Sequence, residues 1–217
     1  MSLATDEFEF ADDGLESVAD GTSILLTGSD ADALTAVFYQ LVAGRGDEHS
    51  VVLATDDPAR DVTRGLDGAE RGAGDRTRVL TSEGSDRGEG VTAVSDLTDL
   101  TGLGMQLSTA VAEAAADGER LRAGILLCSS VLEAVDDTTS VYRLLNSNFL
   151  NHVRRENAIG VCAVDTSVDF GSGVSSTVKG METSFTGRVH VEDATASEAT
   201  VTVSGLGDAD GTHSVVF

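Results

Sequence analysis

The chain is short of positive charge, and of lysine above all. Lys179 is the single lysine among 14 basic residues, which face 37 acidic residues and leave a net charge of −23. A surface this negative repels nucleic-acid phosphates and anionic lipid headgroups. We therefore expect neither nucleic acid nor a membrane among the partners of this 217-residue chain.

Cysteines and long apolar runs are scarce as well. Cys128 and Cys162 lie in separate apolar segments without a second ligand at metal-site spacing, so we expect two buried thiols rather than a disulfide framework or a metal site. No apolar run reaches the roughly 18 residues that span a bilayer. The acidic first 14 residues lack the basic and apolar regions of a signal peptide, which favours a cytoplasmic protein.

The excess of acids over lysine resembles the composition of proteins from haloarchaea that accumulate salt. Multimolar salt screens charges over about 3 Å or less, so that a dense acidic surface is tolerated. In low salt we expect repulsion among the same carboxylates to destabilise the fold. An acidic protein from an ordinary cytosol is the alternative interpretation.

Hydrophobic residues make up 41% of the chain, with a mean hydropathy of +0.01, which is enough to form a core. Short apolar runs alternate with segments of helical period, a pattern typical of a parallel sheet covered by helices on both faces. We expect strands at 23–27, 50–54, 78–80, 91–94, 121–128 and 159–164, and helices at 31–44, after Pro58, and at 96–118, 138–155 and 174–181.

The two ends of the chain differ from its middle. Alternating apolar and polar residues over 185–191 and 199–205 predict an antiparallel extension of the sheet. Residues 1–17 are expected to form an acidic tail with a short edge strand over Phe8–Phe10. The rest of the chain, residues 18–217, is predicted to be a single α/β domain.

The segment after the first expected strand is the candidate phosphate-binding loop, because ligands of parallel α/β sheets bind beyond the carboxyl ends of the strands. Such a loop needs the pattern G-x-x-x-x-G-K-[ST], in which backbone N–H groups and the lysine hold the phosphates and the hydroxyl holds magnesium. The chain keeps the first glycine and the hydroxyl, but has alanine and leucine in place of the second glycine and the lysine. The candidate residues are Gly28, Ser29, Asp30, Ala33, Leu34 and Thr35.

Two aspartates in this segment oppose phosphate binding. Asp30 and Asp32 would repel a triphosphate, and Leu34 cannot neutralise one. On the residues alone, a strand–turn–helix without ATPase activity is the favoured interpretation. Weak nucleotide binding through the Gly28–Thr35 backbone, with Thr35 as the magnesium ligand, is the alternative.

A second pair of acids, Asp56 and Asp57, follows the expected strand 50–54 and precedes Pro58. Acids between a strand and a helix that starts at proline are usually helix N-caps, and this is the favoured role. The alternative is a catalytic role, in which the pair activates a water molecule.

Several segments share, in their order along the chain, the pattern of one family of ATPases. VVLATDDPARDVTRGL places Asp56 and Asp57 where that family has a catalytic carboxylate pair, and GILLCSS places Cys128 and Ser129 where it has a magnesium-ligating acid. Near the C-terminus that family has a basic stretch that serves the nucleotide of a neighbouring subunit, and this chain keeps only the letters GTH of it. Over residues 16–217 the chain resembles the RecA-like ATPases of the KaiC/RadA group, and within it the divergent haloarchaeal proteins termed HTR-like.

The resemblance implies a three-layer RecA-like P-loop NTPase fold, with a mainly parallel central sheet and antiparallel C-terminal strands. The lysine, the magnesium-ligating acid and the basic stretch are absent together. We therefore expect a non-catalytic regulatory or signal-transduction protein without a cofactor, which acts through protein partners and, as in the family, by self-association. The alternative is a weak nucleoside-triphosphate-binding protein or ATPase that uses ATP with magnesium, Thr35 and Asp57. Tyr142 and Arg143 match a helix of the family, and no chemical role follows from them.

Overall fold

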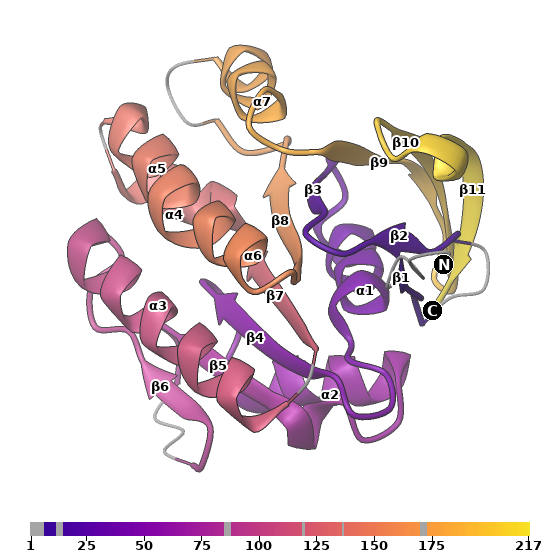
Figure 1. The fold of residues 1–217 in the computed structure, drawn as a ribbon. Coiled ribbons are helices and arrows are strands. Elements are labelled where there is room, and N and C mark those ends of the chain that lie inside the picture. Colours follow the sequence, from indigo (N-terminus) through magenta and orange to yellow (C-terminus); the bar gives the residue numbers. More distant parts are fainter. Residues whose placement is uncertain (1–6, 12–14, 85–87, 119, 136, 170–172) are drawn as a thin grey trace.

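A central sheet of nine strands runs through the computed structural model, which describes residues 7–11, 15–84, 88–118, 120–135, 137–169 and 173–217. The strands are β3 (Ser23–Gly28), β4 (His49–Ala54), β5 (Thr77–Thr81), β6 (Val91–Ala93), β7 (Leu121–Leu126), β8 (Ile159–Asp165), β9 (Gly187–Ala194), β10 (Glu198–Ser204) and β11 (Gly211–Val216). They lie in the order β11-β10-β9-β3-β8-β7-β4-β5-β6 (Figure 1).

Pairing within the sheet is parallel from β9 to β6, whereas β10 pairs antiparallel with both β9 and β11. The expected mixed α/β fold, mainly parallel with an antiparallel C-terminal extension, is confirmed. Strands β3 and β8 are buried along their whole length and mainly apolar, as parallel strands between two helical layers must be. Strand β10 instead alternates buried valines with half-exposed threonines, because helices cover only one of its faces.

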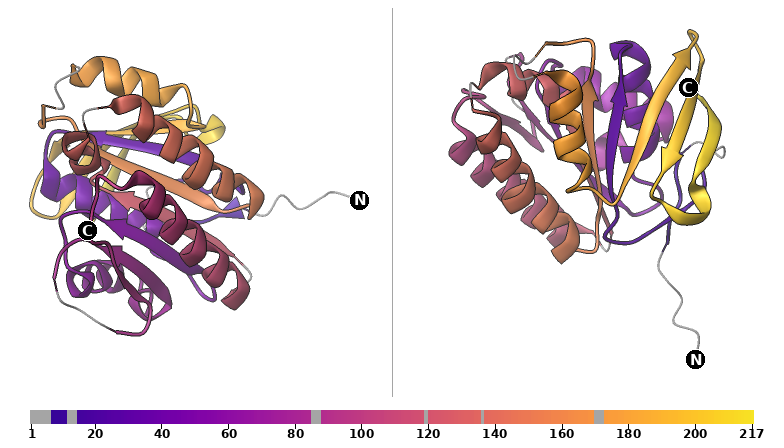
Figure 2. Two further views of the ribbon diagram at one scale, coloured as in Figure 1. Left: turned by 90° about the vertical axis from the view of Figure 1, so that its left-hand side faces the viewer. Right: turned by 90° about the horizontal axis from the view of Figure 1, so that it is seen from above.

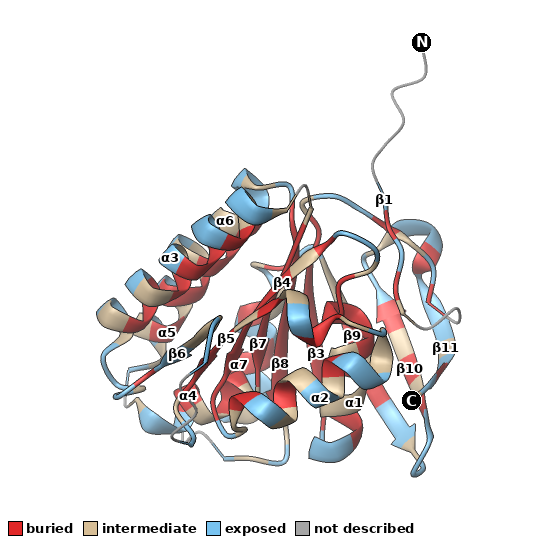
Figure 3. Ribbon diagram, turned by 90° about the horizontal axis from the view of Figure 1, so that it is seen from below, coloured by how far each residue is buried: buried red, intermediate tan, exposed pale blue. Residues whose placement is uncertain are grey.

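Helices cover both faces of the parallel part of the sheet (Figure 2). On one face lie α1 (Ala31–Val42) and α2 (Ala59–Ala69), which share a core with Ile24 and Leu26 of β3. On the other face, packed with Leu25, lie α3 (Leu100–Asp117), α4 (Cys128–Ala134), α5 (Thr138–Leu144), α6 (Asn151–Arg155) and α7 (Val174–Glu182). Successive side chains of β3 therefore enter two separate cores. Figure 3 shows the helices buried toward the sheet and exposed toward solvent.

The end of β7 differs from the expectation. The strand stops at Leu126 instead of continuing to Cys128, because Leu127 adopts a left-handed conformation with φ 54° and ψ 54°. This conformation costs a residue with a β-carbon about 1–2 kcal/mol. Helix α4 begins directly afterwards, so Cys128 belongs to a helix and not to the strand.

Two helices also differ from the expectation. α3 begins at Leu100 and not at residue 96, because the Asp99 carboxylate caps it by accepting from the Gly102 N–H at 2.9 Å. The helix expected over 138–155 is interrupted by a π-helical segment, η2 (Leu145–Leu150).

α1 ends at Val42 with Ala43 as its C-cap, where Gly44 was expected. A β-carbon on Gly44 would lie 2.6 Å from the Glu48 carbonyl oxygen, so this glycine serves the close approach of two loop segments.

The N-terminal segment is attached to the domain. Strands β1 (Glu7–Phe8) and β2 (Val18–Ala19) pair antiparallel in a small sheet of their own, so the strand expected at Phe8–Phe10 begins one residue earlier and does not join the central sheet. Phe8, Phe10 and Leu15 are buried in the core under α1. Two short 3-10 turns, η1 (Gly74–Arg76) and η3 (Gly207–Ala209), complete the described chain. No helix within the described ranges has the length and apolar character needed to cross a membrane.

Candidate functional site

The carboxyl ends of four neighbouring strands form the edge where a ligand would bind. After β3 the chain enters α1 on one face of the sheet, while after the adjacent β8 it continues to α7 on the other. After β4 and β7 the chain again leaves to opposite faces, into α2 and α4. In open α/β sheets a ligand binds outside the strand ends at such switch points, and we name the two of them the β3–β8 crevice and the β4–β7 crevice. The residues expected to form a site lie at these two crevices.

The turn between β3 and α1 is very short. Gly28 is the last residue of the strand and Ala31 the first of the helix, so Ser29 and Asp30 make the whole connection. The Asp30 carboxylate accepts a hydrogen bond from the Ala33 N–H at 3.1 Å and caps the helix. Ala33 is buried, and Thr35 lies half-buried within the first turns of α1.

This geometry leaves a phosphate little to bind. The N-terminus of α1 would attract an anion, but the Asp30 carboxylate already occupies it. Leu34, at the place of the lysine, is fully buried in the core. Gly28 is explained by packing, because a β-carbon there would lie 3.0 Å from the Val191 Cβ. The residues present therefore do not fit ATP with magnesium.

A buried carboxylate that the sequence analysis missed lies beside this turn. Asp165 ends β8, is 7% exposed, and pairs in register with Gly28 across the sheet. Its Oδ1 accepts a hydrogen bond from the Ser167 N–H at 2.8 Å. The signal in the sequence was an apolar strand that ends in an acid, IGVCAVD. A second carboxylate near Asp30 further opposes an anionic ligand.

The second crevice joins the ends of β4 and β7. Thr55 Oγ1 donates toward the carbonyl oxygens of Leu126 at 3.1 Å and Leu127 at 2.9 Å. Ser130 Oγ donates a short hydrogen bond to the Asp56 carboxylate. These contacts tie the two strand ends together across the crevice.

The favoured role of the Asp56–Asp57 pair was wrong. The N-cap of α2 is Pro58, and no side chain caps the helix by a hydrogen bond. The reason is that the Asp56 carboxylate turns away from the helix to Ser130. The pair therefore belongs to the strand-end crevice.

Asp57 is the titratable group at this edge with a raised pKa. Partial burial raises the pKa of its carboxyl above the ordinary value, and the negative charges of Asp56 and Asp61 raise it further. The pKa of the Tyr39 hydroxyl is raised too, first by burial and then by Asp57 and Asp61. A carboxylate whose pKa is raised accepts a proton more readily than an ordinary aspartate does.

The place of the magnesium-ligating acid holds no carboxylate. Cys128 is buried next to Cys162, and burial raises the pKa of the Cys162 thiol well above its ordinary value. The Ser129 hydroxyl lies 3.4 Å from the backbone N–H of Asp165, which donates to it. Across the described parts of the chain, no group of three or more metal-ligating side chains is placed to hold a metal ion.

The remaining family positions lie away from the crevices. The GTH segment forms part of β11 at the edge of the sheet, where His213 Nε2 lies 2.8 Å from the Ala209 carbonyl oxygen. Tyr142 connects two helices, because its hydroxyl donates to the Thr177 carbonyl oxygen at 3.0 Å. Arg143 is exposed on α5.

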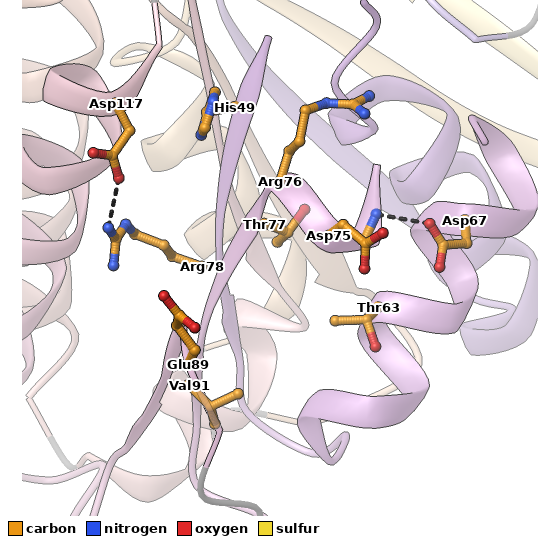
Figure 4. Close-up of a pocket in the computed structure, with 12 residues that line it drawn as sticks. His49, Thr63, Asp67, Asp75, Arg76, Thr77, Arg78, Glu89, Val91 and Asp117 are labelled. Carbon is orange, nitrogen blue, oxygen red and sulfur yellow. Dashed lines mark hydrogen bonds and ion pairs between the residues drawn. The ribbon is translucent and has the colours of Figure 1, made fainter. Parts of the chain in front are cut away.

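A further hollow lies at the opposite edge of the sheet. It measures about 490 Å³ and is lined from the amino ends of β4 and β5, with α2, α3 and β6 around it (Figure 4). Its two arginines are already engaged. Arg78 pairs with Asp117 at 2.7 Å, and Arg76 donates to the Gly44 carbonyl oxygen at 2.9 Å. With its cations bound internally and acids around them, it offers no better site for an anion than the crevices do.

Comparison with known proteins places the chain in a family. No curated protein matches it. A family model described as a family of unknown function (DUF7504) matches residues 21–191, which run from just before β3 into β9 and include both crevices. The chain therefore belongs to this family of unknown function (DUF7504).

Proposed function

We propose that this protein is a non-catalytic regulatory domain of RecA/KaiC-like architecture, which acts through protein contacts and no longer uses a nucleotide. One observation carries the proposal: the Asp30 carboxylate caps α1 at the position where a phosphate would bind, and Leu34 is buried beneath it. An anion would have to displace a cap that stabilises the helix by about 1 kcal/mol, and would then face a carboxylate in place of a lysine.

The crevice at Asp57 supports a second candidate, a weak nucleoside-triphosphate hydrolase. A half-buried carboxyl with a raised pKa suits a general base. It would need a phosphate held nearby, and the turn at Gly28–Ala31 supplies no loop to hold one. We therefore rank it below the regulatory role.

The test is a thermal-shift titration of the full chain in multimolar KCl with Mg-ATP, Mg-GTP and their diphosphates. A ligand present at about 100 times its Kd adds roughly 2.7 kcal/mol of stability. For a domain of this size, that corresponds to a rise in Tm of roughly 5–11 °C. We expect no nucleotide to raise Tm by more than about 1 °C, and a shift of several degrees would overturn the proposal.

A matched variant tests whether the Asp30 carboxylate is what prevents nucleotide binding. Asp30→Ser keeps a side-chain cap on α1 and removes one negative charge. If the carboxylate is the obstacle, this variant gains a shift with nucleotide that the original chain lacks. Should the original chain bind, Thr35→Ala and Asp57→Asn would separate magnesium binding from base catalysis.

A further inference from the structure

Two helical stretches on one face of this acidic molecule carry no acids. Acidic residues make up 37 of the 217 positions, yet none lies between Leu100 and Ala112 or between Thr138 and Arg155. These stretches form most of α3 and the whole of α5, η2 and α6. We name their solvent-facing surface the acid-free face.

The two stretches form one continuous surface. His152 Nε2 lies 2.9 Å from Ser108 Oγ, which joins α6 to α3. Asn148 packs so closely over Gly104 that a β-carbon there would lie 2.8 Å from its side-chain nitrogen. The left view of Figure 2 shows the two helical rods side by side along the same face of the sheet.

An exposed methionine lies on this face beside a groove. The Met105 residue is 67% exposed, which is unusual for a large apolar side chain in this molecule. It borders a groove of about 340 Å³ between α3 and β6, whose lining includes Val91 and Ala110 together with the ion pair of Arg78 and Glu113. A projecting side chain next to a hollow on the same surface is the self-complementary arrangement that a two-fold interface needs.

We propose that two copies of the chain associate through their acid-free faces about a two-fold axis, with Met105 of each copy in the α3–β6 groove of the other. Two molecules of charge −23 repel wherever carboxylates meet; the acid-free face itself has none, and the acid that lines the groove, Glu113, is paired with Arg78 at 3.1 Å. Here Thr101, Met105 and Thr109 form an uncharged stripe one helical turn apart on α3.

The face has the size of a stable interface. It presents 20 exposed or half-exposed residues, eight from α3 and twelve from α5, η2 and α6. Standard interfaces use about 20–30 residues on each side. Arg154 and Arg155 lie at the end of the face, where Arg154 donates to the Ser184 carbonyl oxygen and Arg155 pairs with Glu156. Arg143, exposed on α5, is the third cation of the face, whereas the surroundings of Met105 on the exposed side of α3, Thr101 and Thr109, are uncharged.

The test is sedimentation equilibrium of the full chain in 2–3 M KCl, with three variants. We expect the original chain to be a dimer with a Kd of about 10 µM or lower, a range that such interface areas support. Met105→Glu places two carboxylates near the axis and should raise the Kd on the order of 30-fold or more, as loss of a central interface residue does. Met105→Gln, uncharged and similar in length, should have a smaller effect.

Arg64→Gln is the matched control, because it changes the charge by the same amount at an exposed position of α2 on the other face of the sheet. It should leave the Kd unchanged. Each variant's Tm at a dilution where all are monomeric shows that the fold is intact. A chain that stays monomeric to several hundred micromolar, or a dimer that Met105→Glu does not weaken, would overturn the proposal. Neither outcome bears on nucleotide binding, so the absence of a nucleotide site would stand or fall separately.

Discussion

At the scale of single residues, carboxylates define the edge where a ligand would bind. Asp30 caps α1, Asp165 is buried at the end of β8, and Asp56 accepts from Ser130 across the second crevice. Asp30, Asp165 and Asp56 each accept a hydrogen bond, so that the charge at this edge is fixed in place. Asp57 differs, because burial and its acidic neighbours raise the pKa of its carboxyl.

The raised pKa of Asp57 predicts a pH dependence of stability. A carboxyl with a higher pKa in the folded state stabilises the fold while it is protonated, and this contribution is lost as the pH rises from the ordinary aspartate value through the folded one. Asp57→Asn should therefore be more stable than the original chain at pH 7.5, by no more than about 1 kcal/mol because the group is half-exposed. Urea unfolding at pH 4.5 and pH 7.5 in constant KCl measures the difference in free energy of unfolding between the variant and the original chain.

Asp96→Asn is the control of opposite sign. Thr98 donates from both its backbone N–H and its hydroxyl to the Asp96 carboxylate, which lowers the pKa of that carboxyl. Its removal should reduce stability at pH 7.5 and not at low pH. Equal pH profiles for Asp57→Asn and the original chain would show that the Asp57 carboxyl does not titrate differently in the folded state.

Residues of this kind were only partly predictable. The absence of a lysine and the presence of Asp30 could be seen in the sequence, because the strand–turn–helix around them is local. The direction of the Asp56 side chain could not, since Ser130 lies 74 positions away and comes near only through the pairing of β4 with β7. The position of Asp165 beside Gly28 could not be predicted either, because it depends on the pairing of β8 with β3 in the sheet.

At the scale of elements, three arginines hold the N-terminal segment against the domain. Arg120 donates to the Glu7 carbonyl oxygen at 2.7 Å, and its guanidinium lies 3.8 Å from the centre of the Phe8 ring. Arg122 is fully buried, pairs with Glu48 at 2.6 Å and also donates to the Glu9 carbonyl oxygen. Such a buried charge is tolerated because each partner satisfies it.

Arg45 is the third of these residues and donates to the Phe10 carbonyl oxygen at 2.8 Å. We name Arg45, Arg120 and Arg122 the arginine clamp. A signal for it stands in the sequence and was not used, because Arg122 interrupts the otherwise apolar strand LRAGIL. A charge at such a position must have a buried partner.

The clamp predicts that the N-terminal segment contributes to stability. Phe8→Ala removes a ring that is 1% exposed and leaves the cations of Arg120 and Arg122 without its aromatic face. We expect the free energy of unfolding to fall by about 3 kcal/mol, which is the lower end of the range for replacing a buried phenylalanine with alanine. Chemical denaturation in multimolar KCl gives the free energy of unfolding.

Glu9→Gln is the matched control for that experiment. The Glu9 side chain is 76% exposed and pairs with Arg45 at 3.3 Å, and exposed ion pairs contribute about 0–1 kcal/mol. A Phe8→Ala variant as stable as Glu9→Gln would mean that the segment is not held by its phenylalanines.

At the scale of the whole molecule, the charge and the layers act together. Two cores on opposite faces of one sheet provide the stability, and the outer surfaces carry most of the 37 acids. At 0.1 M salt the Debye length is about 10 Å, long enough for many of these carboxylates to repel one another, whereas at 1 M it is about 3 Å.

The charge predicts a strong dependence of stability on salt. Tm at pH 7.5 should rise steeply between 0.1 and 1 M KCl, because screening reduces the repulsion within a chain of charge −23. Salt can also stabilise by favouring burial, so the same series is repeated at pH 4.5, where part of the carboxylates are protonated. The slope should be clearly smaller there. Equal slopes at the two pH values would assign the effect to burial instead of charge.

The sequence by itself determined the class of fold and the character of the surface. Apolar strands such as SILLTG require cover on both faces, and the terminal strands with period two require only one covered face, so the parallel sheet and its antiparallel extension follow from local patterns. The excess of acids over lysine follows from composition alone.

Only the tertiary structure decided which residues share a crevice or a face. The order β9-β3-β8-β7-β4 brings together strand ends that are far apart along the chain, and it gives Asp56 a partner in Ser130 in place of the helix it precedes. The acid-free face likewise exists only because α3 and α5–α6 pack side by side. Patterns of period two or 3.6 are local properties of the chain, whereas contacts between distant segments depend on how every layer packs, which no local pattern contains.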